Sequence, residues 1–156
     1  MTGSAAVAGT VDTVGTRVVE AARGWIGTPY RHQASCRGAG ADCLGLVRGI
    51  WRDLLGPEPV AVPAYSMDWS EPQGEERLWA AALTHLVPLA RDGQAAGDVI
   101  LFRMRAGSVA KHLGIVSVPH ERFIHAYNRR GVVESPMSGP WARRIVARFA
   151  FPERDG

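Results

Sequence analysis

The feature that most constrains the fold of this chain is a change in hydrophobic period near Pro88. Before Pro88, apolar residues recur three or four positions apart, which is typical of amphipathic helices; the stretches concerned are 16–25, 46–55 and 75–87. After Pro88 the apolar runs are short or alternating, which is typical of strands; they lie at 99–102, 112–118, 123–127, 132–133 and 144–151. Helices that precede strands along the chain predict an α+β domain with an antiparallel sheet.

Local signals set the expected boundaries of these elements. Thr16 is expected to cap the first helix, and Gly56-Pro57 to end the second. In the last strand, alternation predicts Ile145, Ala147, Phe149 and Phe151 on one face and Arg144 and Arg148 on the other. Residues 56–74 hold four prolines and no clear period, so we expect a long surface connection there.

Length and composition favour one ordinary globular domain. The 156 residues are divided here into a flexible lead-in over 1–14 and a single domain over 15–156. The net charge of +3, carried almost entirely by arginine, permits an acidic polymer as partner, although a soluble surface with some excess of arginine is the simpler explanation. A nucleic-acid-binding domain is disfavoured, because no single element interleaves basic and aromatic residues.

The two cysteines are too few for a disulfide framework, although Cys36 and Cys43 could pair with each other. Neither their spacing nor the nearby His32 matches a common zinc pattern, so no metal is expected. No apolar run is long enough for a membrane span, and the N-terminus lacks the pattern of a secretory signal.

Cys43 is the residue that the sequence most clearly marks as a candidate for catalytic chemistry. The sequence carries it from a loop rich in glycine into the first turn of an amphipathic helix. Unpaired N–H groups and the positive end of the helix dipole would favour a thiolate there. Cys43 is therefore a candidate nucleophile, although most buried cysteines only pack as small apolar groups.

Two of the five histidines could serve as its base. His112 and His125 fall on consecutive predicted strands, and a tight turn centred on Pro119-His120 would place His112 opposite Tyr127. His125 would then be the diagonal neighbour of His112, at about 7–8 Å between Cα atoms. A strand histidine taken alone is more often a packed residue, and Gly114 beside His112 is expected to give room for a helix terminus.

Four segments in this order resemble the NlpC/P60 cysteine peptidases. They are Asp42-Cys43-Leu44-Gly45-Leu46, Gly97-Asp98-Val99-Ile100-Leu101-Phe102, His112-Leu113-Gly114-Ile115-Val116 and Phe123-Ile124-His125-Ala126, with Gly27-Thr28-Pro29-Tyr30 upstream. The resemblance spans about Arg17 to Tyr127. The variant looks closest to the peptidases of phage tail clusters and gene transfer agents.

The resemblance implies a papain-like α+β fold with the nucleophile helix packed on a central antiparallel sheet. It implies hydrolysis of peptidoglycan stem peptides, typically at the D-γ-glutamyl–diamino acid bond, without a cofactor. Cys43 would be the nucleophile, His112 the base and His125 the residue that orients it. Tyr30 would lie at the oxyanion site, and Asp42 would contact the amino end of the substrate.

The sequence departs from the family pattern at Leu44, where serine is common, so recognition of a free amino terminus is in doubt. The resemblance further implies a tail or baseplate component, made in the cytoplasm and acting in the cell wall during DNA delivery. Two alternatives stay open: a non-catalytic structural tail component with the same fold, and a thiol acyltransferase or amidase.

Overall fold

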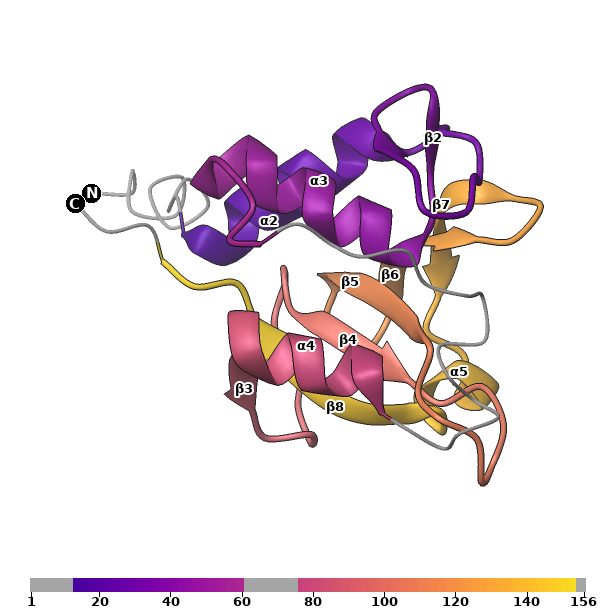
Figure 1. Ribbon diagram of the computed structural model, residues 1–156. Helices are drawn as coiled ribbons and strands as arrows, with labels where there is room; N and C mark the ends of the chain where they lie inside the picture. The colour runs from indigo at the N-terminus through magenta and orange to yellow at the C-terminus, as the bar shows by residue number, and fades with distance from the viewer. Residues whose placement is uncertain (1–12, 61–75, 154–156) are drawn as a thin grey trace, which may run out of the picture.

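The computed structural model describes residues 13–60 and 76–153 and confirms an α+β fold (Figure 1). Its helices are α2 (Val14–Trp25), α3 (Cys43–Leu55), α4 (Arg77–His85) and the short α5 (Gly139–Ala142). Its strands are β1 (Ser35–Cys36), β2 (Gly40–Ala41), β3 (Val87–Leu89), β4 (Val99–Phe102), β5 (His112–Val118), β6 (Arg122–Tyr127), β7 (Gly131–Pro136) and β8 (Ile145–Ala150).

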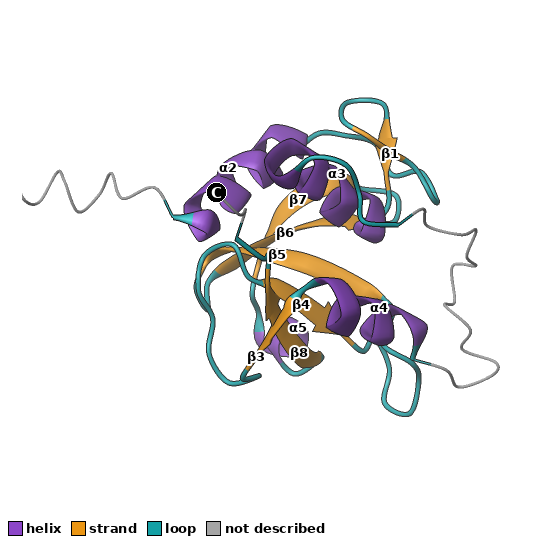
Figure 2. Ribbon diagram, turned by 60° about the vertical axis from the view of Figure 1, so that its left-hand side comes forward, coloured by secondary structure: helices purple, strands orange, loops and turns teal. Residues whose placement is uncertain are grey.

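Six of the strands form one antiparallel sheet in the order β3-β8-β4-β5-β6-β7. Figure 2 shows α2 and α3 lying together along one side of β5, β6 and β7. The strands β1 and β2 form a separate hairpin that leads into α3. The sheet thus supports the helix that begins at Cys43.

The two faces of the sheet are both apolar, and each has its own core. The larger core joins the sheet to α2, α3 and α4, through side chains such as Trp25, Leu46 and Ile115. The smaller core lies on the opposite face, where Phe102 and Phe123 pack against Trp141 of α5. Alternation along β5 and β6 turns His112 and His125 toward this smaller core.

The cap of α2 lies three residues before the one that the sequence predicted. Thr13 is the N-cap, and Thr16 occupies the N3 position of a capping box. The Thr16 amide donates to Thr13 Oγ1 over 3.1 Å, and the Thr13 amide donates to Thr16 Oγ1 over 2.9 Å. Thr16 therefore supplies the return bond of the cap rather than the cap itself.

The β5–β6 hairpin has the predicted register because a bulge in β5 offsets a loop that is wider than expected. The loop is wider than a two-residue turn, with Pro119, His120 and Glu121 between the strands and a positive φ of 63° at His120. A bulge at Ser117 absorbs the additional residue. The pairing of Ile115 with Ile124, continued to the strand ends, sets His112 opposite Tyr127 as predicted.

Two expectations about side-chain placement were wrong. The register of β8 against β4 shifts between Leu101 and Phe102, so Ile145 joins the smaller core while Val146 packs on the larger one. The lack of a side chain at Gly114 makes room for rings rather than for a helix terminus. A Cβ there would meet the Phe123 ring at 2.8 Å, on the face away from α3.

Several expectations fall wholly or partly outside the described residues. Most of the lead-in over 1–14 and of the connection over 56–74 lies there, so these two predictions and the single domain over 15–156 remain predictions. Within 13–60 and 76–153, no helix is long and apolar enough to cross a membrane.

Candidate active site

Cys43 is the first residue of α3 and lies almost wholly inside the molecule, with 8% of its surface exposed. Its thiol donates a long hydrogen bond of 3.9 Å to the carbonyl of Lys111. Lys111 directly precedes the first residue of β5, His112. The sulfur therefore lies against the end of the central strand that carries the first histidine.

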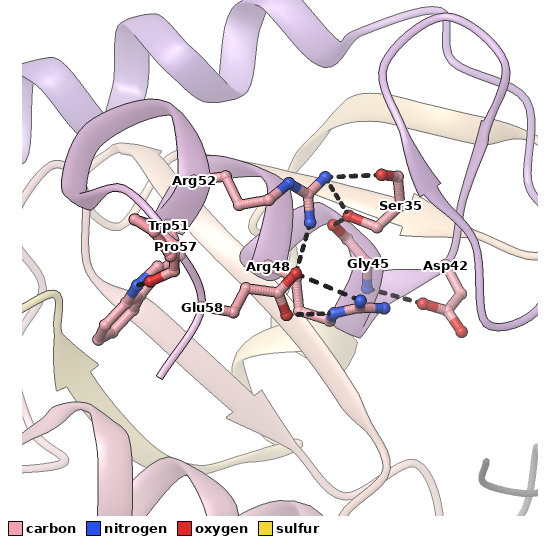
Figure 3. A network of polar contacts seen from close by, with 8 residues as sticks. All are labelled: Ser35, Asp42, Gly45, Arg48, Trp51, Arg52, Pro57 and Glu58. Atoms are coloured by element: carbon pink, nitrogen blue, oxygen red, sulfur yellow. Dashed lines mark hydrogen bonds and ion pairs between the residues drawn. The ribbon is translucent and has the colours of Figure 1, made fainter. Parts of the chain in front are cut away.

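The loop before Cys43 is fixed to α3 by a polar network, drawn in Figure 3. Ser35 donates through Oγ to the Gly45 carbonyl over 2.6 Å, and Arg52 donates to the Ser35 carbonyl over 2.6 Å. Arg52 and Arg48 both hold Glu58, at 2.8 Å and 2.7 Å. The network ties the loop, the helix and the segment after the helix together around the nucleophile position.

The two candidate histidines touch each other. His112 Nε2 and His125 Nδ1 are 2.7 Å apart, and both residues are buried. The second ring nitrogen of His125, Nε2, is 2.9 Å from the hydroxyl of Ser135 on β7. The result is a row of three polar groups on adjacent strands, which leaves His112 Nδ1 as the nitrogen outside this row.

Aromatic rings enclose the histidine pair. The Trp141 ring centroid is 5.6 Å from that of His112 and 5.2 Å from that of His125. Tyr127 stacks on His125 with centroids 5.3 Å apart. The pair therefore lies in an apolar setting, where a hydrogen bond is stronger and a charge is costlier than in water.

Among the residues the structure describes, Cys43 makes no hydrogen bond to an imidazole. The sulfur approaches the backbone at the end of β5, whereas the rings of His112 and His125 contact Phe102 and Phe123 of the smaller core, on the face of the sheet opposite the larger core that includes α3. Of the two histidines, His112 is the one that directly follows Lys111, the residue whose carbonyl accepts from the sulfur. The structure thus joins the histidines to each other and brings the cysteine beside their strand.

Burial overturns the expectation of a resting thiolate. It raises the pKa of Cys43 to about 12, and the Asp42 carboxylate acts in the same direction. Burial lowers the pKa of His112 to about 3, aided by His125, and lowers that of His125 to about 4. Thiol and imidazole are consequently both neutral at pH 7, and a neutral imidazole is the form that can accept a proton.

Tyr30 is half-buried and bridges to Ala41 just before the cysteine. Its pKa is raised to about 12 chiefly by burial; an ionised Cys43 and the Asp42 carboxylate act in the same direction. A phenol with that pKa keeps its proton at neutral pH and can donate a hydrogen bond. Tyr30 therefore lies near the thiol in the protonated form that can donate a hydrogen bond to an oxyanion.

Asp42 caps α3 from a position where only 3% of its surface is exposed. Its carboxylate accepts bonds of 2.7 Å from the amides of Gly45 and Gln33, and His32 Nδ1 is 3.7 Å away. This geometry gives Asp42 a structural task in shaping the turn that begins with Cys43. Contact with the amino end of a substrate stays a prediction.

Cys36 and Leu44 are the remaining residues that the sequence singled out. Cys36 is exposed and Cys43 buried, and both are free thiols. No group of three metal-ligating side chains occurs within the part of the chain that the structure describes. Leu44 packs partly against the larger core instead of offering a hydroxyl.

Sequence reasoning missed Ser135 and Trp141. Ser135 pairs with Phe123 across the sheet, so strand parity would have placed it on the face of His125 had β7 been extended beyond Val133. Trp141 follows Pro140 at the start of a short helix, a pattern that gives no indication of which strands the ring will cover.

Comparisons with known proteins agree with one another. The sequence profile of the NlpC/P60 family matches residues 27–149. Murein DD-endopeptidase MepS/Murein LD-carboxypeptidase of Escherichia coli K12 is 30% identical over 142 residues, covering 86% of this chain and 65% of that protein. A probable endopeptidase of Haemophilus influenzae is 28% identical over 117 residues, covering 75% of this chain and 62% of that protein. The chain thus spans less than two thirds of the length of each of these curated relatives.

Solved structures share the fold. The NlpC/p60 domain of the peptidoglycan hydrolase SagA superposes with a TM-score of 0.61 at 20% identity, covering 90% of this chain and all of that one. An NLP/P60 family protein similar to a lipoprotein, from Staphylococcus aureus, gives a TM-score of 0.59 at 18% identity, covering 93% of this chain and 43% of that one.

Proposed function

Because the chain belongs to the NlpC/P60 family, we propose that it is a cysteine peptidase that hydrolyses the stem peptides of peptidoglycan. The single observation that carries the proposal is the position of a buried thiol at the start of α3, beside the strand whose first residue belongs to a hydrogen-bonded histidine pair. The named activities of the Escherichia coli relative and of SagA support peptidoglycan as the substrate.

In the proposed mechanism Cys43 is the nucleophile and His112 the general base. His112 Nδ1 takes the thiol proton as the sulfur attacks the carbonyl carbon, and His125 holds the resulting imidazolium through Nε2 of His112. The oxyanion is bound by the Cys43 amide, at the first position of α3, and by the Tyr30 hydroxyl. The imidazolium then protonates the leaving amine, and a water activated by His112 releases the acyl group.

Since the resting thiol and imidazole are neutral, proton transfer is part of the attack rather than a step completed beforehand. The substrate carbonyl has to enter beside Lys111 and displace the bond that the thiol makes there. The step therefore requires His112 Nδ1 to come within hydrogen-bond reach of the sulfur when the substrate binds. Hydrogen bonds of catalytic groups commonly tighten on substrate binding.

For the bond that is cleaved, we propose the one between D-γ-glutamate and the diamino acid, as the resemblance implies. The name of the Escherichia coli relative favours a second candidate, a DD-endopeptidase bond. Both are amides, and the proposed mechanism serves either. Leu44 in place of serine bears on which of them is preferred, since it removes a hydroxyl beside the nucleophile.

The test is incubation of the purified protein with defined muropeptides, followed by mass spectrometry. Cleavage beside D-γ-glutamate releases fragments with a new amino group on the diamino acid, whereas DD-endopeptidase activity converts cross-linked dimers into monomers. Cys43→Ala is the control and has to abolish the product. An intact substrate with the wild-type protein would leave the non-catalytic alternative, and a product joined to an added amine would identify a transferase.

We further propose that the protein is a tail or baseplate component of a phage-like particle that opens the cell wall during DNA delivery. The likeness of its ordered motifs to peptidases of phage tail clusters and gene transfer agents supports this role, and its basic charge suits an anionic wall. Particles that carry Cys43→Ala should assemble but deliver DNA poorly. Normal delivery by such particles would favour a purely architectural role.

A further inference from the structure

Beyond the cysteine and the two histidines, we infer that Ser135 is a positioning residue that selects the proton arrangement in which His112 can act as a base. The inference rests on the proposed function, because it assigns Ser135 a part in the same reaction. It depends on one geometric fact. Ser135, His125 and His112 form a continuous row in which the two successive contacts are 2.9 Å and 2.7 Å.

The row is possible because three neighbouring strands present these side chains on one face of the sheet. His125 of β6 pairs with Val133 of β7, and Phe123 pairs with Ser135. Ser135 is thus the diagonal neighbour of His125, within reach of its outer ring nitrogen. The first residue of β5, His112, meets the inner ring nitrogen from the other side.

A neutral imidazole carries one proton, so the row has two self-consistent proton arrangements. In the first, His125 Nε2–H donates to Ser135 Oγ, His112 Nε2–H donates to His125 Nδ1, and His112 Nδ1 is bare. In the second, the Ser135 hydroxyl donates to His125, His125 donates to His112, and His112 Nδ1 carries the proton. Only the first arrangement leaves His112 able to take a proton from Cys43.

The reaction itself requires Ser135 as an acceptor. When His112 gains a proton, it must still donate through Nε2, so His125 must keep Nδ1 bare and hold its own proton on Nε2. That Nε2–H lies in a buried setting under Trp141, where a donor without an acceptor is costly. The lone pair of Ser135 Oγ is the acceptor that the structure provides.

Removal of this hydroxyl has a defined consequence. In the described residues of the wild type, every buried polar side-chain atom has a hydrogen-bond partner. In Ser135→Ala, the proton arrangement that makes His112 a base leaves the buried Nε2–H of His125 without its acceptor. We expect kcat to fall by about 10- to 100-fold, the factor that corresponds to one unsatisfied buried donor. KM should change by less than about twofold, because the row does not touch the substrate.

Ser135→Thr and Ser117→Ala supply the matched controls. Threonine keeps the hydroxyl and is favoured in strands, so Ser135→Thr should retain most of the wild-type kcat. Ser117 is another strand serine, itself buried, but its hydroxyl donates to Glu134 over 2.6 Å and takes no part in the row. Ser117→Ala should therefore lower stability without changing the histidines.

The decisive measurement is the protonation state of each ring nitrogen, read from ¹⁵N spectra of histidine-labelled full-length protein. The wild type and Ser135→Thr should show the proton on Nε2 of both His112 and His125. Ser135→Ala should shift signal toward the Nδ1–H forms, and Ser117→Ala should not. Gln variants of each histidine assign the signals.

Unchanged imidazole spectra in Ser135→Ala would overturn the inference, whatever happens to the activity. Equal losses of kcat in Ser135→Ala and Ser117→Ala would overturn it as well, because they would indicate a general structural effect. If the wild type hydrolyses no muropeptide, the proposed function fails, yet the spectra still decide the role of Ser135.

Discussion

The close approach of Gly45 to the loop before Cys43, the proposed nucleophile, gives the sharpest test of how this site is built. A Cβ at Gly45 would lie 1.8 Å from the Ala34 carbonyl oxygen. To regain ordinary contact at 3.4 Å, that carbonyl would have to retreat by about 1.6 Å. Because the obstacle is backbone and not a flexible side-chain tip, Gly45→Ala must move the loop or the helix.

The expected magnitude follows from three contributions. Overpacking costs about 1–3 kcal/mol, and alanine returns up to about 1 kcal/mol through its helix propensity. In the wild type, the Ala34 carbonyl accepts from the Asp42 amide at 3.3 Å and the Gly45 carbonyl accepts from Ser35. Moving the loop would weaken these hydrogen bonds at a cost of about 1 kcal/mol. We expect unfolding to become easier by about 2 kcal/mol, which lowers Tm by about 4–8 °C.

Activity should fall further than stability alone explains. The loop and Asp42 define the turn that presents Cys43, and a misplacement near 1 Å can cost about 100-fold in rate. The assay combines urea denaturation with muropeptide hydrolysis at a temperature where the variant is fully folded. The expected result is a kcat about 100-fold below that of the wild type.

Two other helical glycines provide matched controls. At Gly24 a Cβ would meet only the tip of the Arg37 side chain at 3.2 Å, so Gly24→Ala should be neutral or slightly stabilising. At Gly49 it would meet the Trp25 ring at 2.0 Å, so Gly49→Ala should lower stability with a much smaller effect on kcat. If Gly45→Ala stays within about 0.5 kcal/mol of the wild type and keeps its activity, the reasoning is refuted.

Three further predictions concern protonation and the polar network. Because burial holds the pKa of His112 at about 3, the midpoint of the acidic limb in a pH profile of kcat/KM should lie well below 6.5, the ordinary pKa of histidine. Folding lowers the pKa values of His112 and His125, so their contribution to stability is complete above pH 6.5 and is lost as the pH falls toward 4. The free energy of unfolding should decrease by up to about 1.4 kcal/mol per pH unit for each histidine, which urea denaturation at a series of pH values would measure. Arg52→Met should cost about 1 kcal/mol in thermal unfolding, since the bonds to Ser35 and Glu58 are partly exposed to solvent.

Each of these has a simple control. An acidic limb at or above pH 6.5 would contradict the burial of His112, and a pH dependence of stability unchanged in His125→Gln would contradict that of His125. For the network, Arg91→Met is the comparison, because its pair with Asp92 is exposed and should contribute nothing measurable. Equal effects of the two arginine substitutions would show that the network adds no stability.

The sequence predicted the elements of the site better than the environment of its side chains. Strand parity placed His112 and His125 on one face, and the hairpin register kept that relation even though the loop is wider than expected. Parity depends only on local alternation, which a sequence displays directly. A bulge such as the one that moves Ile145 to the smaller core breaks this alternation and leaves no local mark.

The protonation state of Cys43 is the property that sequence reasoning had wrong. A helix start favours a thiolate, but the burial of the sulfur and the Asp42 carboxylate outweigh that local effect. Both opposing influences come from the packing of α3 and its loop, which depends on residues remote in sequence. Ser135 and Trp141 were missed for the same reason, because their importance follows from which strands they meet.

The bulge at Ser117 has a consequence for how this domain tolerates change in length. Strand β5 is a partition, with the nucleophile helix against one surface and the imidazole row on the other. Deleting Ser117 would remove the bulge and keep the pairing of Val116 with Phe123, whereas deleting one residue between the bulge and His112 would turn His112 to the other face of the sheet. A single-residue deletion before the bulge should therefore be far more damaging than a deletion of Ser117 itself, which is the position at which this hairpin tolerates a change in length.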